Sequence, residues 1–392
     1  MGSLYASRII KSWSRIASII RGMHKKFDYI DSDEQLIAFS REIASSQWLA
    51  VDTEFMRERT YYAQLALVQI ASEQACALID VPALTSLEPL LDAFTRDNCV
   101  KIMHSASQDL EVLEQILGAM PQPLFDTQIA AGFLGEAEQI AYASLVRQRL
   151  GIELEKDQTR TNWLQRPLSE AQLGYAEADV LYLHELYQQL LSDLGEIERA
   201  DWVFEESRAL AEKTQLAGDP ELAWKRLQSL ARLKPGQQHI ARDLAVWRER
   251  RAQQRDLPRE WVLKKQALIG IAQRQPQSMQ QLRDIEGLGE RSIQGIGRLL
   301  LKVVDHARQP VSPSVLQCEL SAGQRGQVKT LMGRMREIAD AESIAPALIA
   351  NRSTIESLVV GERDLSLLRG WREQVAGREL LEMLENAVTD SG

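Results

Sequence analysis

The sequence of 392 residues holds few cysteines and no long apolar run, and these absences exclude several classes of protein. Its three cysteines, Cys76, Cys99 and Cys318, are too few and too scattered for a disulfide scaffold, and they form no C-x-x-C pair that would hold zinc. No window contains the roughly 18 consecutive apolar residues that a membrane-spanning helix requires. We therefore expect a protein of the reducing cytoplasm that makes no contact with a membrane.

Acidic residues are absent from residues 1–27, which carry six basic residues and five serines. Four apolar residues between Ile9 and Ile20 fall on one helical stripe. A basic amphipathic segment of this kind is typical of a transit peptide. It is also compatible with an ordinary surface helix, or with a disordered or extraneous stretch upstream of a natural start at Met23. We leave residues 1–26 out of the predicted fold as an N-terminal basic extension.

The composition is otherwise that of a globular protein. The hydrophobic fraction of 45% and the charged fraction of 26% exclude a collagen-like, a low-complexity and a wholly disordered chain. At about 150 residues per domain, the length predicts two or three domains.

The net charge of −9 conceals an uneven distribution of charge along the chain. Residues 28–200 hold 11 Lys and Arg against 29 Asp and Glu, a net of −18. Residues 221–275 hold 13 against 5, a net of +8. Such asymmetry indicates either that the basic part contacts a polyanion or that both faces are merely solvated, and charge alone leaves both interpretations open.

Residues 27–200 alternate predicted strands with predicted helices, which is typical of an α/β domain. Short apolar runs predict buried strands at 47–55, 63–72, 75–81 and 99–105. The connections between the first three are too short for a parallel crossover, so we expect an antiparallel meander. Helices are expected at 107–117, after a short strand within 123–135, and over 169–194, where Ser169 and Gln172 form a capping box.

Strand signals vanish after about residue 200. Residues 217–306 and 316–390 are predicted to be helical, with a linker at 307–315 between them. Each helical part ends on a glycine-bearing turn and a leucine-rich helix, which suggests a diverged duplication. We predict one mixed α/β domain followed by two small all-α bundles.

Two carboxylates lie at the end of the first predicted strand. Asp52 and Glu54 are two residues apart, so their side chains share a face at a spacing of roughly 6–7 Å. No lysine or arginine lies within two residues of either. Because such close like charges repel, the pair predicts a raised pKa, a basic partner or a bound divalent cation. Oxygen ligands of this type suit Mg²⁺ or Mn²⁺.

Two further acids accompany this pair. Asp109 lies just inside the helix after the fourth strand, and Asp179 lies in the long helix among apolar residues. Tyr175 precedes Asp179 by four residues, so the hydroxyl and the carboxylate share a helix face. Taken singly, a helix cap for Asp109, a surface position for Asp179 and a core position for Tyr175 are the simpler interpretations. Taken as an ordered set on these elements, they favour a catalytic function.

The set Asp-x-Glu, Asp and Tyr-x-x-x-Asp resembles the DEDDy group of 3′→5′ exonucleases, and the similarity extends to the ribonuclease D family. The exonuclease segments of that family resemble A-V-D-T-E-F (50–55), K-I-M-H-S-A-S-Q-D-L-E-V-L (101–113), F-D-T-Q-I-A-A-G-F-L-G (125–135) and W-L-Q-R-P-L-S-E-A-Q-L-G-Y-A-E-A-D-V-L-Y-L (163–183). Residues 217–300 resemble the helicase-and-RNase-D C-terminal (HRDC) domain, and the last segment resembles the family's second such domain. Asn162, where Asp is more usual, and the N-terminal extension depart from the pattern.

The resemblance implies an α/β, RNase H-like exonuclease domain at 27–200 with a mixed central sheet flanked by helices. Two HRDC-type bundles would follow at 217–306 and 316–390. The implied activity is removal of 3′ nucleotides from RNA, in particular maturation of tRNA 3′ ends, with release of nucleoside 5′-monophosphates. No obligate protein partner is indicated.

The resemblance also implies two divalent metal ions, Mg²⁺ or Mn²⁺, that clamp the scissile phosphate. Asp52 would bridge both ions, Glu54 and Asp179 would complete the shell of the first, and Asp109 would hold the second through water. Tyr175 would orient the attacking water, because a side chain with an ordinary pKa of about 10 is a poor base.

Candidate contacts to the substrate are weaker. His104 could touch a phosphate or the last sugar, and Arg166 and Lys156 could meet the RNA backbone, although a satisfied core histidine and solvated surface charges are equally compatible. The basic segment should hold RNA by phosphate contact, and its densest cluster comprises Arg248, Arg250, Arg251, Lys264 and Lys265. Trp224, Trp247 and Trp261 are available for base stacking or for the core of a bundle.

Two alternatives to an exoribonuclease remain open. The first is a DNA 3′→5′ exonuclease of the helicase-associated type, although no G-x-x-x-x-G-K-[ST] phosphate loop is present. The second is a catalytically inactive nucleic-acid-binding scaffold, which would be expected to have lost at least one of the acids.

Overall fold

The computed structural model describes residues 27–137, 139–154, 161–227, 230, 233–308 and 320–389. The basic extension at 1–26 and Lys156 therefore lie outside the described residues. The chain divides into two compact units. Within the described residues, the first unit comprises 27–56, 65–212 and 320–389, and the second comprises 57–64 and 213–308. The segment predicted as a third domain thus lies in the same unit as the sheet.

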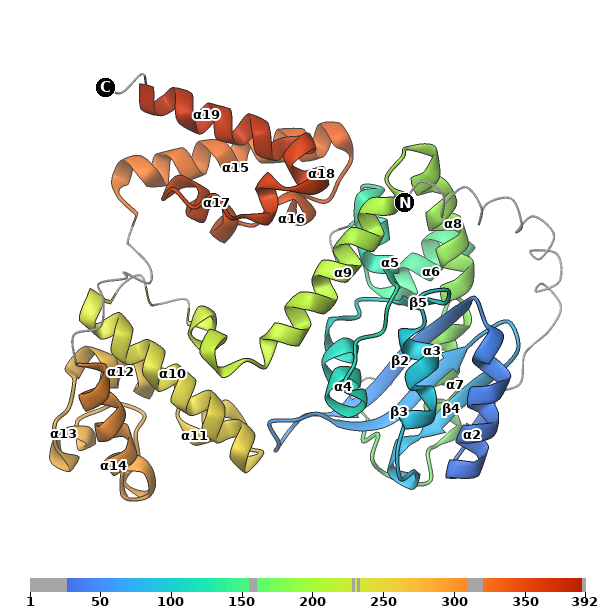
Figure 1. Cartoon of the computed structure of the whole chain (residues 1–392), viewed down its shortest axis with the longest axis horizontal. Helices are drawn as coiled ribbons and strands as arrows, with labels where there is room; N and C mark the ends of the chain where they lie inside the picture. Colours follow the sequence, from blue (N-terminus) through green and yellow to red (C-terminus); the bar gives the residue numbers. More distant parts are fainter. Residues whose placement is uncertain are drawn as a thin grey trace. The chain divides into compact units, whose positions relative to one another are not determined.

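The first unit contains a six-stranded mixed sheet in the order β1-β4-β3-β2-β5-β6 (Figure 1). Its strands are β1 (Asp28–Ile30), β2 (Trp48–Met56), β3 (Gln64–Ala71), β4 (Cys76–Asp80), β5 (Val100–Met103) and β6 (Leu124–Asp126). β3 and β4 pair antiparallel, as the meander predicts, whereas β2–β5, β5–β6 and β1–β4 pair parallel. The mixed α/β fold predicted from the sequence is confirmed.

Burial decreases along β2 from its first half to its second half. Residues from Trp48 to Val51 are buried, as a strand covered on both faces requires, whereas Asp52, Glu54 and the residues after them are partly exposed. The strand therefore carries its carboxylates to the margin of the core, where they are still partly covered. β1 was not predicted, because three residues are too few to show a periodic pattern.

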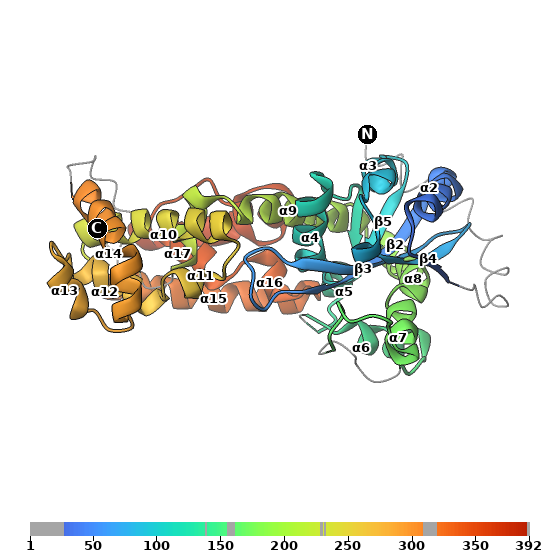
Figure 2. The ribbon, with the colours of Figure 1, turned by 90° about the horizontal axis from the view of Figure 1, so that it is seen from below.

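Helices cover both faces of this sheet, with α2 and α3 on one face and α7 and α8 on the other (Figure 2). Their bounds are α2 (Asp33–Glu42), α3 (Leu91–Thr95), α4 (Ser107–Leu117), α5 (Thr127–Phe133), α6 (Tyr142–Leu150), α7 (Glu170–Leu181) and α8 (Leu183–Glu196). The capping box of Ser169 and Gln172 opens α7 as predicted. The prediction of a single helix over 169–194 is wrong, because the helix is interrupted at Tyr182, which separates α7 from α8.

A second layer of helices completes the first unit. These helices are α9 (Ala200–Ala217), most of which belongs here, and α15 (Ala322–Glu342), α16 (Pro346–Ile349), α17 (Arg352–Val359), α18 (Gly370–Arg372) and α19 (Arg378–Thr389). α15 and α19 lie side by side (Figure 1). Glu206 of α9 accepts a hydrogen bond of 2.9 Å from the Trp371 indole and pairs with Arg372. These charge-assisted contacts fix the last segment of the chain to α9.

The second unit is helical. It contains a 3-10 turn at Pro220–Arg226 and the helices α10 (Pro235–Arg255), α11 (Arg259–Val262), α12 (Lys265–Arg274), α13 (Met279–Arg283) and α14 (Glu290–Ala307). A separate apolar core lies between α10, α12 and α14, with Leu244, Leu268 and Leu300 fully buried. In the described part of the chain, no helix combines the length and apolar character needed to cross a membrane.

Candidate active site

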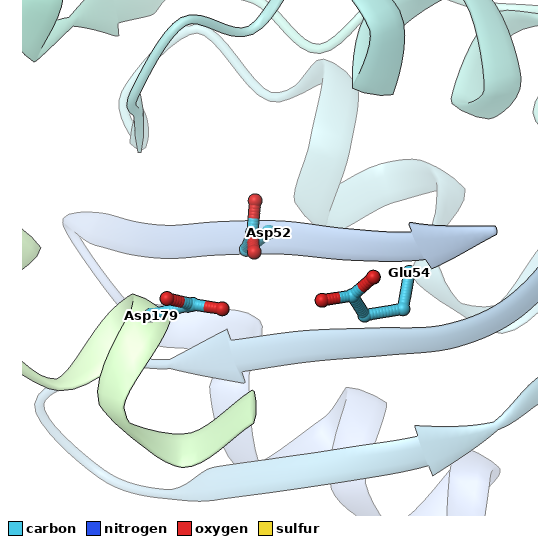
Figure 3. Close-up of side chains that lie close together, drawn as sticks. All are labelled: Asp52, Glu54 and Asp179. Atoms are coloured by element: carbon cyan, nitrogen blue, oxygen red, sulfur yellow. The ribbon is translucent and has the colours of Figure 1, made fainter. Parts of the chain in front are cut away.

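Three carboxylates from distant parts of the chain converge at the end of β2. Asp52 and Glu54 project from β2, and Asp179 projects from α7 (Figure 3). One ligand oxygen from each side chain lies within 4.8 Å of the others. The close packing of α7 on β2 therefore brings together acids separated by more than a hundred residues.

Asp109 lies beside this cluster of three carboxylates but is not one of its members. It is the third residue of α4 and is 8% exposed. The Thr53 hydroxyl donates a hydrogen bond to its Oδ1 atom. Its charge also contributes to the raised pKa of Asp52, so the two carboxyl groups interact electrostatically.

The site is unfavourable for negative charge. Burial raises the pKa of Asp52 well above its ordinary value, and the charges of Asp109, Asp179 and Glu54 raise it further. Burial also raises the pKa of Asp109 to about 7, although the hydrogen bond from Thr53 opposes the shift. A divalent cation would offset this repulsion, and an all-oxygen donor set fits a hard cation such as Mg²⁺ or Mn²⁺. The residues present therefore fit a divalent metal centre.

Tyr175 lies on α7, four residues before Asp179, and is partly buried. Its ring centroid is 6.1 Å from that of Trp163, which is fully buried at 1% exposure. Trp163 therefore packs beside the tyrosine ring. The tyrosine shares the Asp179 helix, so the two side chains are positioned by the same element.

Tyr142 is a neighbour of the site that the sequence did not reveal. It is the first residue of α6, and its hydroxyl donates a hydrogen bond of 3.0 Å to the carbonyl oxygen of Ala178, next to Asp179. Burial raises the pKa of Tyr142 well above its ordinary value, and the charges of Asp179 and Asp52 raise it further. No local pattern marks this tyrosine, because its place depends on how α6 packs beside α7.

His104 is held by hydrogen bonds inside the first unit. Its Nδ1 lies 2.9 Å from the Thr127 hydroxyl, and its Nε2 lies 3.0 Å from the Ile140 carbonyl oxygen. Both ring nitrogens are therefore engaged within the protein. The N-cap of α5 is Asp126, whose carboxylate accepts a hydrogen bond from the N–H of Gln128.

Arg166 is also engaged within the protein. Its guanidinium donates to both carboxylate oxygens of Asp80 and to the carbonyl oxygens of Ala66 and Trp163. These bonds join the segment before α7 to β3 and β4. Arg166 thus ties the segment before α7 to two interior strands of the sheet.

The basic cluster predicted on the second unit separates into buried and exposed members. Arg248 is 6% exposed and donates to the Leu263 carbonyl oxygen, so it faces the interior of the unit. Arg250, Lys264 and Lys265 are exposed, and Arg250 pairs with Glu221. The Arg251 guanidinium lies 5.8 Å from the centroid of the Trp247 ring.

A hollow of about 500 Å³ on the second unit is lined in part by residues of this basic cluster. Its lining includes Trp247, Arg250 and Arg251 of α10 and Lys302 and His306 of α14, together with the acids Glu221 and Asp243. Lys302 and His306 were not singled out from the sequence, because only the packing of α14 on α10 brings them to the same hollow.

The chain is similar to known exonucleases along most of its length. A family described as 3′-5′ exonuclease matches residues 27–195, and the HRDC domain family matches residues 237–304. The fold and the acidic site thus define a 3′→5′ exonuclease.

Comparison with individual relatives identifies the family within the class of 3′→5′ exonucleases. Ribonuclease D of Sphingobium indicum is 36% identical over 373 residues, which cover 91% of this chain and 94% of that relative. Ribonuclease D of Pseudomonas paraeruginosa is 35% identical over 371 residues, covering 92% and 98%. The crystal structure of Escherichia coli RNase D, described as an exoribonuclease involved in structured RNA processing, matches with a TM-score of 0.84 and 31% identity over 92% of this chain and 99% of that chain. The chain belongs to the ribonuclease D family of 3′→5′ exoribonucleases, which confirms the resemblance seen in the sequence.

Proposed function

We propose that this enzyme removes nucleotides from the 3′ ends of tRNA precursors and other structured RNAs by hydrolysis at a two-metal centre. The observation that carries the proposal is the convergence of Asp52, Glu54 and Asp179 within 4.8 Å, with Asp109 beside them. The relative of known structure is described as acting in structured RNA processing, which supports the same class of substrate here.

Each acid has a separate proposed role. Asp52 would contribute to both cation positions, since the charges of the other three acids all act on it. Glu54 and Asp179 would complete one position, and Asp109, held by Thr53, would serve the other through water. When bound, two divalent cations supply an activated water and stabilise the leaving 3′ oxygen. The acids must be ionised to hold them, so the raised pKa values oppose binding at low pH.

Tyr175 would orient the attacking water by a hydrogen bond. The tyrosine precedes Asp179 by four residues on the same helix, a spacing that places the two side chains on one helix face. Its hydroxyl is a weak acid with an ordinary pKa of about 10, which suits positioning better than proton abstraction. Products would be nucleoside 5′-monophosphates, because water attacks the phosphorus and the 3′ oxygen of the shortened RNA leaves.

The second unit would hold the body of the RNA by phosphate contact. Its exposed basic residues include Arg250, Lys264 and Lys265, and Arg251 lines the same hollow as Trp247. Phosphate contacts of this kind are independent of sequence, which suits an enzyme that must accept many RNA ends.

The test is to incubate 5′-labelled tRNA precursor and a single-stranded DNA of the same sequence with the enzyme, with Mg²⁺ or with EDTA. We expect stepwise shortening of the RNA from its 3′ end with Mg²⁺ and no shortening with EDTA. Asp179→Asn should abolish nucleotide release while RNA binding survives, and Asp31→Asn, a change of an exposed carboxylate, should have no effect.

The alternatives predict different results. Preferred shortening of the DNA would favour the helicase-associated type of exonuclease. RNA binding without any shortening would favour an inactive scaffold. Full turnover by purified Asp179→Asn protein would show that the acidic site is not where hydrolysis occurs.

A further inference from the structure

The loop that follows the catalytic strand belongs to the helical unit and not to the unit of the sheet. Residues 57–63 connect β2 to β3, and contacts assign them, together with the first residue of β3, to the second unit. The loop begins at Arg57, directly after the last residue of β2 and three residues after Glu54. The strand with two of the carboxylates therefore runs straight into a segment held by the unit that we propose to bind RNA.

Asp256 holds the backbone of this loop. Its Oδ1 atom accepts hydrogen bonds of 3.0 Å from the backbone N–H groups of both Tyr61 and Tyr62. Asp256 is the C-cap residue of α10 and has a left-handed backbone with φ of 48°. A left-handed backbone is adopted most readily by Gly, Asn and Asp. Asp256 therefore fits the position where the helix ends, and its carboxylate contacts the loop from there.

The Tyr61 side chain forms a second attachment. It is 7% exposed, and its hydroxyl donates to Oε1 of Glu249 while accepting from Gln253 at 3.1 Å and from Arg259 at 3.0 Å. The Arg259 guanidinium also lies 4.6 Å from the centroid of the tyrosine ring, within the range of a cation–π contact. The Tyr61 side chain is thus held by the hydrogen bonds of its hydroxyl and by the contact of its ring face with Arg259.

Glu249 anchors this network from inside the unit. Its side chain is 1% exposed and pairs with Arg259 and Arg226 at 2.6 and 2.9 Å. A carboxylate buried to this degree is tolerated only when its oxygens are satisfied, and Tyr61 supplies one of the donors. Undocking of the loop would remove the Tyr61 hydroxyl from the Glu249 carboxylate and leave this buried acceptor without one of its donors. The docked loop is therefore favoured in the free enzyme.

We infer that Tyr61 and Asp256 are positioning residues that tether the strand carrying Asp52 and Glu54 to the RNA-holding unit. RNA bound by the second unit would then stay coupled to β2 through the docked loop, and not only through the connections at residues 212–213 and 319–320. This inference rests on the proposed function. The tether matters for RNAs long enough to contact both units, and it contributes nothing for an oligonucleotide that reaches only the carboxylates.

The test compares two substitutions at Asp256 that both accept its left-handed backbone. Asp256→Gly removes the acceptor for the Tyr61 and Tyr62 N–H groups, whereas Asp256→Asn keeps an oxygen at the same place. For Asp256→Gly we expect the KM for a tRNA precursor to rise about tenfold. The undocked loop would no longer keep RNA bound by the second unit at a high effective concentration near the carboxylates. Its kcat and KM on a trinucleotide should be unchanged, and Asp256→Asn should resemble the wild type on both substrates.

Limited trypsin digestion reports docking without any activity measurement. The loop contains the exposed residues Arg57 and Arg59. Cleavage after these residues should be faster in Asp256→Gly than in the wild type or in Asp256→Asn, under conditions where all three proteins remain folded by circular dichroism. Tyr61→Phe, which keeps the ring against Arg259 but removes the hydroxyl, should give an intermediate rate of cleavage.

Three results would overturn the inference. An unchanged KM for the precursor in Asp256→Gly, with an active wild type, would remove the tether and leave the proposed function intact. An equal loss on precursor and trinucleotide would show that the loop acts on the carboxylate site itself. Equal trypsin sensitivity of Asp256→Gly and Asp256→Asn would show that Asp256 does not hold the loop. By contrast, failure of the wild type to shorten any RNA would count against the proposed function.

Discussion

The hydroxyl of Thr53 donates a hydrogen bond to Oδ1 of Asp109, and this bond joins β2 to the first turn of α4. Thr53 is 5% exposed and lies between Asp52 and Glu54, so a buried neutral side chain governs the fourth acid of the site. The bond opposes the effect of burial, which raises the pKa of Asp109 to about 7. Thr53 therefore helps to keep Asp109 ionised.

Thr53→Val should move the acid limb of activity to higher pH. The variant loses the donor, so the pKa of Asp109 should rise further, and at limiting Mg²⁺ the acid limb of kcat/KM should move up by about one pH unit. Thr53→Ser keeps the hydroxyl and should follow the wild-type profile. An unshifted acid limb in Thr53→Val would mean that Asp109 ionisation does not limit activity.

Asp52→Asn should abolish turnover and stabilise the protein in EDTA. The pKa of Asp52 is raised in the folded state, so its stabilising contribution is complete below the unfolded pKa and is lost as pH rises through the folded pKa. The variant carries no charge there, so its melting temperature should exceed that of the wild type by a few degrees at pH 8. At pH 4 the two proteins should melt together.

Binding of Mn²⁺ should weaken as pH falls. Protons compete with the cation for Asp109, whose pKa is about 7, and Asp52 adds to the effect. Displacement of a single proton with this pKa lowers the apparent affinity about tenfold between pH 8 and pH 6. Isothermal titration calorimetry of the wild type checks this directly, and an affinity independent of pH would contradict the raised pKa values.

Removal of two basic side chains from the second unit should reduce the salt dependence of RNA binding. Each phosphate that is no longer neutralised lowers the slope of log K against log salt by roughly 0.7 on single strands, so Arg250→Gln with Arg251→Gln should flatten it by about 1.4. Lys329→Gln with Arg336→Gln, two exposed positions on α15, is the matched control. Equal slopes in both double variants would exclude the hollow from RNA binding.

Local patterns in the sequence were sufficient to predict the central strands and the two pairs of residues within the acidic set. The spacing of Asp52 and Glu54 on a strand places both side chains on one face, and the spacing of Tyr175 and Asp179 does the same on a helix. The meander of β3 and β4 follows from a connection too short to cross over. Each of these features depends only on residues close together in the chain.

Features set by tertiary packing could not be predicted. Arg248 belongs to a run of arginines that looks solvated, yet α10 turns it inward to the Leu263 carbonyl oxygen. Tyr142 reaches the backbone beside Asp179 only because α6 packs next to α7. The assignment of residues 57–64 to the helical unit depends on Asp256, some 195 residues away. No spacing rule connects positions so distant.

The central claim is that the four carboxylates hold divalent cations at the end of β2. Crystals of the enzyme soaked in Mn²⁺ and measured for anomalous scattering test it most directly. We expect two peaks about 3.5–4 Å apart within coordination distance of Asp52, Glu54 and Asp179, and their loss in Asp52→Asn. Crystals that show these side chains in place but no anomalous peak among them, at a Mn²⁺ concentration that supports turnover, would contradict the account.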